Sequence, residues 1–190
     1  QNNFRRRGLA RQAIAVVTQV VVDREDPAFH APDKPIGSIM EETEARLLAA
    51  KLGWEVQEER GRGWRRVVPS PAPREIVELP IVEHLIGAGF VVIAAGGGGI
   101  PVVRYNDGDL EGVEAVVDKD LASSLLARGL RADLFIILTA VEKVAIGFGT
   151  PEEHWLDNLT VGEARRHLQD GEFPPGTMGP KIHAMIEYIE

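Results

Sequence analysis

The sequence predicts an α/β fold built on a mostly parallel sheet. Three apolar runs, residues 13–22, 90–95 and 132–138, show no alternation of apolar and polar positions. Runs of this kind are typical of strands that are buried on both faces, as the central strands of parallel sheets are. Segments with helical spacing lie between the runs, and strands that alternate with helices favour an α/β architecture.

Four consecutive glycines, Gly96, Gly97, Gly98 and Gly99, follow the second apolar run. Without a Cβ atom, the backbone can turn sharply there and bring its N–H groups against a ligand. In open α/β sheets, ligands bind beyond the carboxyl ends of the strands, which is where this turn is expected. A plain flexible turn is the alternative, although turns seldom need four glycines. We therefore expect these glycines to line a ligand site.

The composition is ordinary for a globular domain, with 190 residues, 44% hydrophobic and 26% charged. The formal net charge of −8 argues against general nucleic-acid affinity. The chain has no cysteine, which excludes disulfides, thiolate catalysis and cysteine metal sites. No apolar run approaches the ~18 residues of a membrane span, and no signal-peptide pattern is present. We expect a cytoplasmic protein with no nucleic-acid or membrane partner.

Helical spacing marks both ends of the chain and four segments between them. Residues 1–8 are typical of the end of a helix, because three arginines precede a glycine that can cap it. Residues 181–190 have helical spacing without a cap after it. Both ends suggest a piece of a longer protein. The other helices are expected at residues 40–53, 80–88, 121–128 and 160–169, the last with a capping box.

Residues 24–73 interrupt the α/β pattern. Prolines break the periodicity before the first internal helix, and more prolines close the segment. Two short strands, 54–58 and 64–68, are expected around a glycine turn. A connection of this length with secondary structure of its own is usually a lid or a second lobe. We therefore divide the chain into a core, residues 1–23 and 74–190, and a protruding α+β subdomain, residues 24–73.

Three lysines stand where a positive charge could do chemistry. Lys119 lies where a strand is followed by a helix, and a lysine at a helix N-terminus makes a natural phosphate site. Its neighbour Asp120 could orient the lysine or help to hold Mg²⁺, or could simply cap the helix. Lys181 opens the last helix, where a lysine is unfavourable to the dipole, and Lys34 has prolines nearby. Plain surface exposure is the alternative for both.

Three lysines on separate loops and a tetraglycine turn fit phosphoryl transfer. That reaction needs charge stabilisation of the equatorial oxygens and in-line positioning of donor and acceptor. Other chemistries lack their motifs in this sequence. There is no Walker motif, no GxGxxG after a strand and no GxSxG serine, and the five histidines show no metal-ligand spacing. We therefore expect no dedicated metal-binding residues.

Seven segments make the sequence similar to the carbamate kinases, a branch of the amino acid kinase superfamily. They occur in the same order and extend over essentially all 190 residues. GRGWRRVVPSP with GGGGIPVV is specific to carbamate kinases, whereas VDKDLAS and GTMGPK are shared in outline with acetylglutamate and related kinases. The segments are residues 18–23, 33–37, 61–71, 94–103, 112–123, 137–144 and 176–182.

The resemblance implies a three-layer αβα sandwich on a mostly parallel sheet, in a Mg²⁺-dependent homodimer. It implies phosphoryl transfer between ATP and carbamate, usually from carbamoyl phosphate to ADP. Lys119 and Lys181 would stabilise the transferring group, and Asp120 would organise them. Lys34 would reach over the site, and Gly96–Gly99 would hold carbamate or phosphate. Five residues would border the nucleotide: Thr139, Ala140, Val141, Phe148 and Met178.

Parts of the family pattern have no counterpart in this sequence. They are a glycine-rich N-terminal loop, a later GNGPQVG-like segment, and the final strand and helix. We therefore expect a longer parent protein. Two alternatives to a carbamate kinase stay open. One is a non-catalytic ligand-binding or regulatory module of the same fold. The other is a related kinase for an acyl phosphate such as that of acetylglutamate, which the 24–73 segment disfavours.

Overall fold

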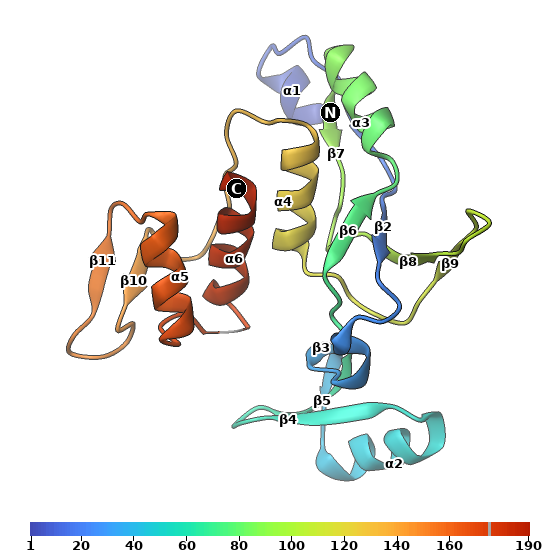
Figure 1. The fold of residues 1–190 in the computed structure, drawn as a ribbon, viewed down its shortest axis with the longest axis vertical. Coiled ribbons are helices and arrows are strands. Elements are labelled where there is room, and N and C mark those ends of the chain that lie inside the picture. Colours follow the sequence, from blue (N-terminus) through green and yellow to red (C-terminus); the bar gives the residue numbers. More distant parts are fainter. Residues whose placement is uncertain (175) are drawn as a thin grey trace.

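The computed structural model describes residues 1–174 and 176–190, and Figure 1 shows their arrangement. None of the helices in these residues is both long and apolar enough to cross a bilayer. The helices are α1 (Asn2–Arg6), the 3₁₀ helix η1 (Pro27–His30), α2 (Glu42–Leu52), α3 (Leu79–Gly87), α4 (Lys119–Gly129), α5 (Val161–Gln169) and α6 (Met178–Ile189). The strands are β1 (Ala13–Ala15), β2 (Gln19–Val22), β3 (Lys34–Met40), β4 (Glu55–Glu59), β5 (Gly63–Val68), β6 (Pro73–Ile76), β7 (Val91–Ile93), β8 (Ile100–Arg104), β9 (Leu110–Gly112), β10 (Val144–Ile146) and β11 (His154–Leu156).

The core contains two parallel strand pairs. β2 pairs with β8, with Val20 opposite Pro101, and β1 pairs with β7. The four-stranded sheet has the order β6-β2-β8-β9, in which β6 and β9 are antiparallel to their neighbours. Helix α3 packs against β7, and α4 packs against β6. The α/β organisation predicted from the apolar runs is therefore present, in a sheet that also contains antiparallel pairs.

The apolar run at residues 13–22 forms two strands, β1 and β2, rather than the single strand predicted. Between them lies Thr18, which is buried. Its hydroxyl oxygen accepts a hydrogen bond from the Ala95 N–H at 2.9 Å, and its carbonyl oxygen accepts one from the Ile100 N–H at 2.8 Å. The run breaks because Thr18 bonds to both ends of the glycine turn.

The prediction that the apolar runs form strands buried on both faces is confirmed for β2. It is wrong for the other two runs. Val20 is fully buried, whereas Ile93 in β7 is 59% exposed and Leu138 is 90% exposed. Residues 132–138 form no strand, because nothing within the described residues pairs with them. An apolar run shows that a covering surface is needed, but it does not show which segment provides that surface.

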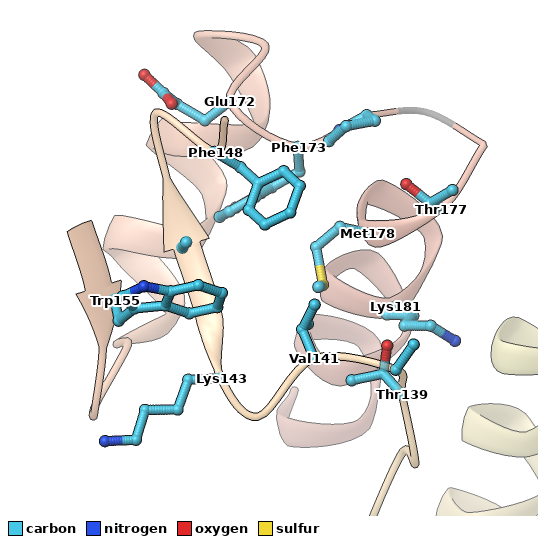
Figure 2. Close-up of a pocket in the computed structure, with 13 residues that line it drawn as sticks. Thr139, Val141, Lys143, Phe148, Trp155, Glu172, Phe173, Thr177, Met178 and Lys181 are labelled. Carbon is cyan, nitrogen blue, oxygen red and sulfur yellow. The ribbon is translucent and has the colours of Figure 1, made fainter. Parts of the chain in front are cut away.

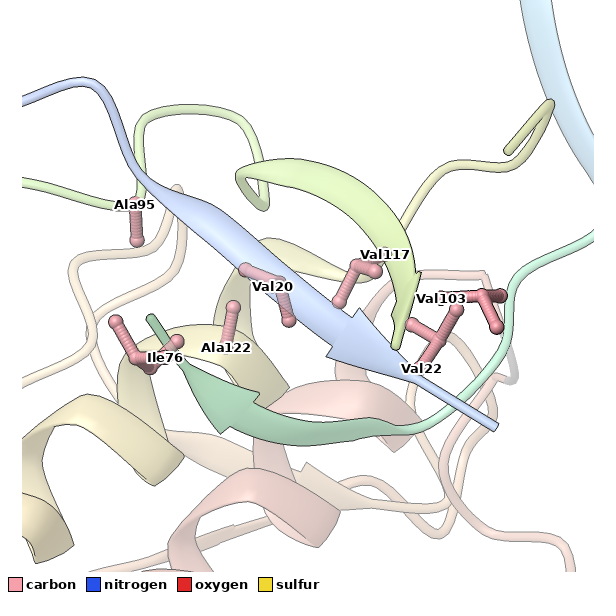
Figure 3. Close-up of a cluster of buried hydrophobic side chains, with 7 residues drawn as sticks. All are labelled: Val20, Val22, Ile76, Ala95, Val103, Val117 and Ala122. Carbon is pink, nitrogen blue, oxygen red and sulfur yellow. The ribbon is translucent and has the colours of Figure 1, made fainter. Parts of the chain in front are cut away.

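A buried cluster joins the central sheet to helix α4 (Figure 3). It combines side chains from β2, β6 and β8, the residue before the glycines, the segment that leads into α4, and the first turn of α4. Because Ala122 of α4 is fully buried in it, the start of α4 is held against the sheet. Helix α4 packs in turn along α6. The members of the cluster are Val20, Val22, Ile76, Ala95, Val103, Val117 and Ala122.

Strands β3, β5 and β4 form a separate antiparallel sheet, in that order, with α2 packed on it. This protruding sheet lies at the lower end of Figure 1. Strand β3 is not predicted from the sequence, because the prolines at 32 and 35 indicate a break; Pro35 is nevertheless tolerated on an edge strand. Since Met40 ends β3, helix α2 begins at Glu42 and not at residue 40. The division of the chain at residues 24–73 and the lid role stay predictions.

Gly98→Ala is expected to destabilise the protein by about 2–4 kcal/mol. Gly98 has φ +134°, and a Cβ atom placed on it would lie 1.9 Å from the carbonyl oxygen of Val117. Urea denaturation of the full-length protein measures the change in unfolding free energy. Gly97→Ala is the matched control, because nothing lies within 4 Å of a Cβ atom there. Equal stability of the two variants would contradict the close packing at Gly98.

Candidate active site

Asp120 brings together the two lysines that the sequence places at helix starts. Its Oδ2 atom lies 3.0 Å from Lys181 Nζ and 3.5 Å from Lys119 Nζ. Asp120 lies in the first turn of α4, and Lys181 is the fourth residue of α6, not its opening residue as the sequence predicts. Asp120 is buried, and only 18% of the Lys181 side chain is exposed. Two ammonium groups therefore converge on one carboxylate.

Asp118 connects the same helix start to the protruding sheet. It is the N-cap of α4, since its Oδ1 accepts a hydrogen bond from the Asp120 N–H at 2.8 Å. The cap is therefore not Asp120, as the alternative interpretation had it. Asp118 Oδ2 accepts a hydrogen bond from Lys34 Nζ at 2.7 Å. Burial raises the pKa of Asp118, but the hydrogen bonds from Lys34 and from the Asp120 N–H lower it further, so the pKa lies below its ordinary value.

Three ammonium groups and two carboxylates thus meet at the N-terminus of α4. The free N–H groups of a helix start add partial positive charge. The net positive charge favours a bound anion, and a phosphoryl group offers several oxygens to such donors. Because the lysines come from β3, α4 and α6, the fold and not the local sequence assembles them.

A cleft of about 1040 Å³ lies between the protruding sheet and the starts of α4 and α6. Lys34 and Asp118 both line it. The protruding sheet adds Arg62 and Arg65, which share Glu59 as a partner at 3.2 and 2.9 Å. The wall that faces the lysine cluster is therefore also rich in cations, which suits an anionic substrate.

A smaller cavity of about 230 Å³ lies beside α6 (Figure 2). Lys181 also lines it, so this side chain stands between the cavity and the Asp120 carboxylate. The structure brings together here all five residues predicted to border a nucleotide: Thr139, Ala140, Val141, Phe148 and Met178.

Several other residues of this cavity are missed by the sequence analysis, among them Trp155 and Phe173. Trp155 lies opposite Ala145 in the β10–β11 hairpin, and its ring centre is 6.1 Å from that of Phe148, edge to face. Figure 2 shows both rings beside the cavity, with Met178 on the α6 side. The wall is thus aromatic and apolar, which suits a flat heterocyclic ring. The register of the β10–β11 hairpin places Trp155 at the cavity, and this hairpin is not predicted from the sequence.

The glycine turn divides into two parts. Gly98 and Gly99 pack closely, since Cβ atoms on them would collide with Val117 and Val20. Cβ atoms on Gly96 and Gly97 would meet nothing within 4 Å, and these two glycines, together with Gly99, line a hollow of about 410 Å³. The turn lies against the start of α4, but this hollow shares no lining residue with the cleft that contains Lys34. The open part of the turn is the part that a ligand could approach.

Comparison with known proteins identifies the family. The profile of the Amino acid kinase family matches residues 4–190. The chain belongs to this family. The carbamate kinase of Thermococcus kodakarensis is 50% identical over 189 residues, and the carbamate kinase-like protein YahI of Escherichia coli is 50% identical over 190 residues. Both alignments cover 100% of this chain and 60% of the relative, so the chain spans about 60% of the length of these curated relatives.

Solved structures agree with the family assignment. A carbamate kinase from Giardia lamblia, bound to AMP-PNP, aligns with a TM-score of 0.86 and 44% identity. The alignment covers 98% of this chain and 59% of that one. The resemblance stated from the sequence and the predicted fold class of an amino acid kinase are therefore confirmed.

Asp118 is the residue of the lysine cluster that the sequence analysis of this amino acid kinase does not select. Its local signal is present, because aspartate before the first residue of a helix is a strong N-cap. Its ion pair with Lys34 has no local signal in the sequence, because Lys34 is 84 positions away. The pairing depends on how the protruding sheet folds back over α4.

The lowered pKa of Asp118 predicts a pH-dependent contribution to stability. A carboxyl group with a lower pKa in the folded than in the unfolded chain stabilises the fold above its unfolded pKa, and this contribution is lost as the pH falls through its folded pKa. We expect the loss of unfolding free energy in Asp118→Asn to be largest near neutral pH and to shrink below about pH 4. Asparagine keeps the N-cap. Urea denaturation at several pH values measures the difference, and a constant difference would refute the prediction.

Proposed function

We propose that the protein containing this chain is a carbamate kinase, which transfers a phosphoryl group from carbamoyl phosphate to ADP and in reverse from ATP to carbamate. The convergence of Lys119 and Lys181 on Asp120, between an apolar cavity and a cationic cleft, is the observation that carries the proposal. The similarity to the carbamate kinase of Thermococcus kodakarensis supports the choice of substrate.

The nucleotide is proposed to occupy the apolar cavity. Its base would contact the wall that includes Val141, Phe148 and Met178, and its phosphates would extend toward Lys181 at the edge of the cavity. The Giardia lamblia relative was solved with AMP-PNP, an ATP analogue, which supports ATP and ADP as substrates. In this arrangement, the phosphate end of the nucleotide meets the lysine cluster.

Phosphoryl transfer would take place at the start of α4. Lys119 and Lys181 would stabilise the charge that spreads over the transferring oxygens, because positioned cations are worth most where charge develops. Asp120 would hold both ammonium groups at a fixed separation. Lys34 would reach the group from the cleft, and the open glycines Gly96 and Gly97 would hold carbamate or phosphate.

Mg²⁺ is proposed to arrive with the nucleotide. Within residues 1–174 and 176–190, no three or more histidines or carboxylates are grouped as a metal site, and Asp118 and Asp120 are both paired with lysines. Mg²⁺ is commonly held by one or two carboxylates together with substrate phosphates, so a complete protein cage is not needed. The ion would supply further positive charge to the phosphates. A cytoplasmic homodimer is also proposed, on the resemblance to the carbamate kinases.

A kinase for a different acyl phosphate is a second candidate. The Escherichia coli relative named carbamate kinase-like is as similar to this chain as the carbamate kinase of Thermococcus kodakarensis. This degree of identity therefore does not by itself fix the acyl group. Rates with carbamoyl phosphate, acetyl phosphate and acetylglutamyl phosphate, measured with the same full-length protein, separate the candidates. A non-catalytic module would bind ADP and turn over none of them.

ATP formation from ADP and carbamoyl phosphate by the full-length protein tests the proposal. We expect activity in the wild type and a loss of at least about 100-fold in kcat for Lys181→Ala, since a cation at the transferring group acts mainly in the transition state. Lys51→Ala, on the exposed side of α2, is the matched control and should retain wild-type activity. Normal ADP binding without turnover in the wild type would refute the proposed function.

Trp155→Ala tests the nucleotide cavity. We expect the KM for ADP to rise roughly 10-fold, because stacking of a base on an aromatic ring contributes on the order of 1–3 kcal/mol. The KM for carbamoyl phosphate should stay near its wild-type value. Trp155→Phe keeps an aromatic ring and should restore most of the affinity for ADP. An unchanged KM for ADP in Trp155→Ala would place the base elsewhere.

A further inference from the structure

The protruding sheet is joined to the core just before α4. Val116 forms two hydrogen bonds to the chain that leaves the sheet: its N–H donates to Pro69 O at 2.9 Å, and its carbonyl oxygen accepts from Ser70 Oγ at 2.9 Å. Two ion pairs connect the sheet to the same part of the core, at positions 114 and 118. These contacts all fall on the short segment that leads into Lys119 and Asp120.

The two ion pairs differ in burial. In the Arg66–Glu114 pair, 74% of the glutamate side chain is exposed. In the Lys34–Asp118 pair, only 8% of the aspartate side chain and 31% of the lysine side chain are exposed. Exposed pairs contribute little, whereas a buried carboxylate depends on its counter-charge. Of the two ion pairs, the Lys34–Asp118 pair is therefore the one that contributes more to holding strand β3 over the cleft.

Lys34 can serve either Asp118 or a bound anion. Its side chain lines the cleft while its ammonium group bonds to Asp118 Oδ2. A lysine ammonium is a point charge with three donors on a flexible stem, so a small movement exchanges one oxygen partner for another.

We propose that Asp118 is a positioning residue for the protruding sheet: it holds Lys34 over the empty cleft and releases it to the phosphoryl group when the anionic substrate binds. This inference rests on the proposed function, because it assigns a regulatory exchange to the same cleft.

Asp118 keeps other partners when Lys34 leaves. Its Oδ1 atom still accepts the Asp120 N–H, and the charge of Lys119 also acts on it. The exchange therefore does not leave a bare buried carboxylate. It follows that Asp118 and the anion compete for one ammonium group. Removing the aspartate charge should strengthen anion binding and, at the same time, loosen β3 in the absence of an anion.

The affinity of the full-length protein for inorganic phosphate, measured by calorimetry, tests the competition. Asp118→Asn keeps the helix cap and should lower the phosphate Kd about 3- to 10-fold. In a Lys34→Met background, the same substitution should change Kd less than about twofold, because the shared ammonium is gone. Asp33→Asn is the matched control for general charge, since Asp33 lines the same cleft beside Lys34. Its expected effect is also below about twofold.

Hydrogen exchange of the same variants without phosphate tests the loosening. Lys34→Met and Asp118→Asn should each raise amide exchange in β3 several-fold, the double variant should add nothing further, and Asp33→Asn should leave it unchanged. The proposal is overturned if Asp118→Asn changes the phosphate Kd no more than Asp33→Asn does. It is also overturned if the effect of Asp118→Asn on Kd persists in the Lys34→Met background. Unchanged exchange in Lys34→Met overturns it too. Neither measurement requires turnover. Absence of ATP formation would therefore refute only the proposed function. Normal ATP formation without coupling between Asp118 and Lys34 in the phosphate Kd would refute only this inference.

Discussion

The shared carboxylate of Asp120 is the interaction on which the site depends. Without it, the ammonium groups of Lys119 and Lys181 would repel each other at short range, and without them a buried carboxylate would be strongly unfavourable. Lys181 is 61 positions away in the sequence, so only the packing of α6 on α4 brings it there. Ala122 fixes the first turn of α4 in the apolar cluster. The positions of the charges are therefore set by the hydrophobic core beneath them.

The elements of the fold that could be predicted are those with a local cause. The capping box of Thr160 and Glu163 starts α5 as expected, and the glycine turn ends β7 close to the expected point. The errors concern pairing partners. Strand β3 was missed because Pro35 is a break in most strands and is tolerated at a sheet edge. Residues 132–138 have the composition of a strand, yet a strand needs a partner, which no single segment of sequence shows.

The candidate site shows the same limit. Lys119, Asp120 and Lys181 could be selected because helix starts and charge make them conspicuous, and the resemblance to the carbamate kinases gave them roles. The sequence predicts that these side chains lie close together, but only the fold shows that both lysines contact Asp120. The places of Asp118 and Trp155 in the site are not predicted, because each depends on a partner that the local sequence does not indicate. For Asp118 the partner is Lys34 in an ion pair, and for Trp155 it is the opposite strand of the hairpin.

Strand β3 borders solvent on one side, since it is an edge of the protruding sheet. Pro35 has no N–H to offer an incoming strand, and Lys34 beside it carries a charge; natural sheets use both devices to prevent edge-to-edge association. A sheet that projects from the body of the protein would otherwise be a ready template for aggregation. We expect the two residues to limit self-association at high concentration, and one of them, Lys34, also lines the cleft.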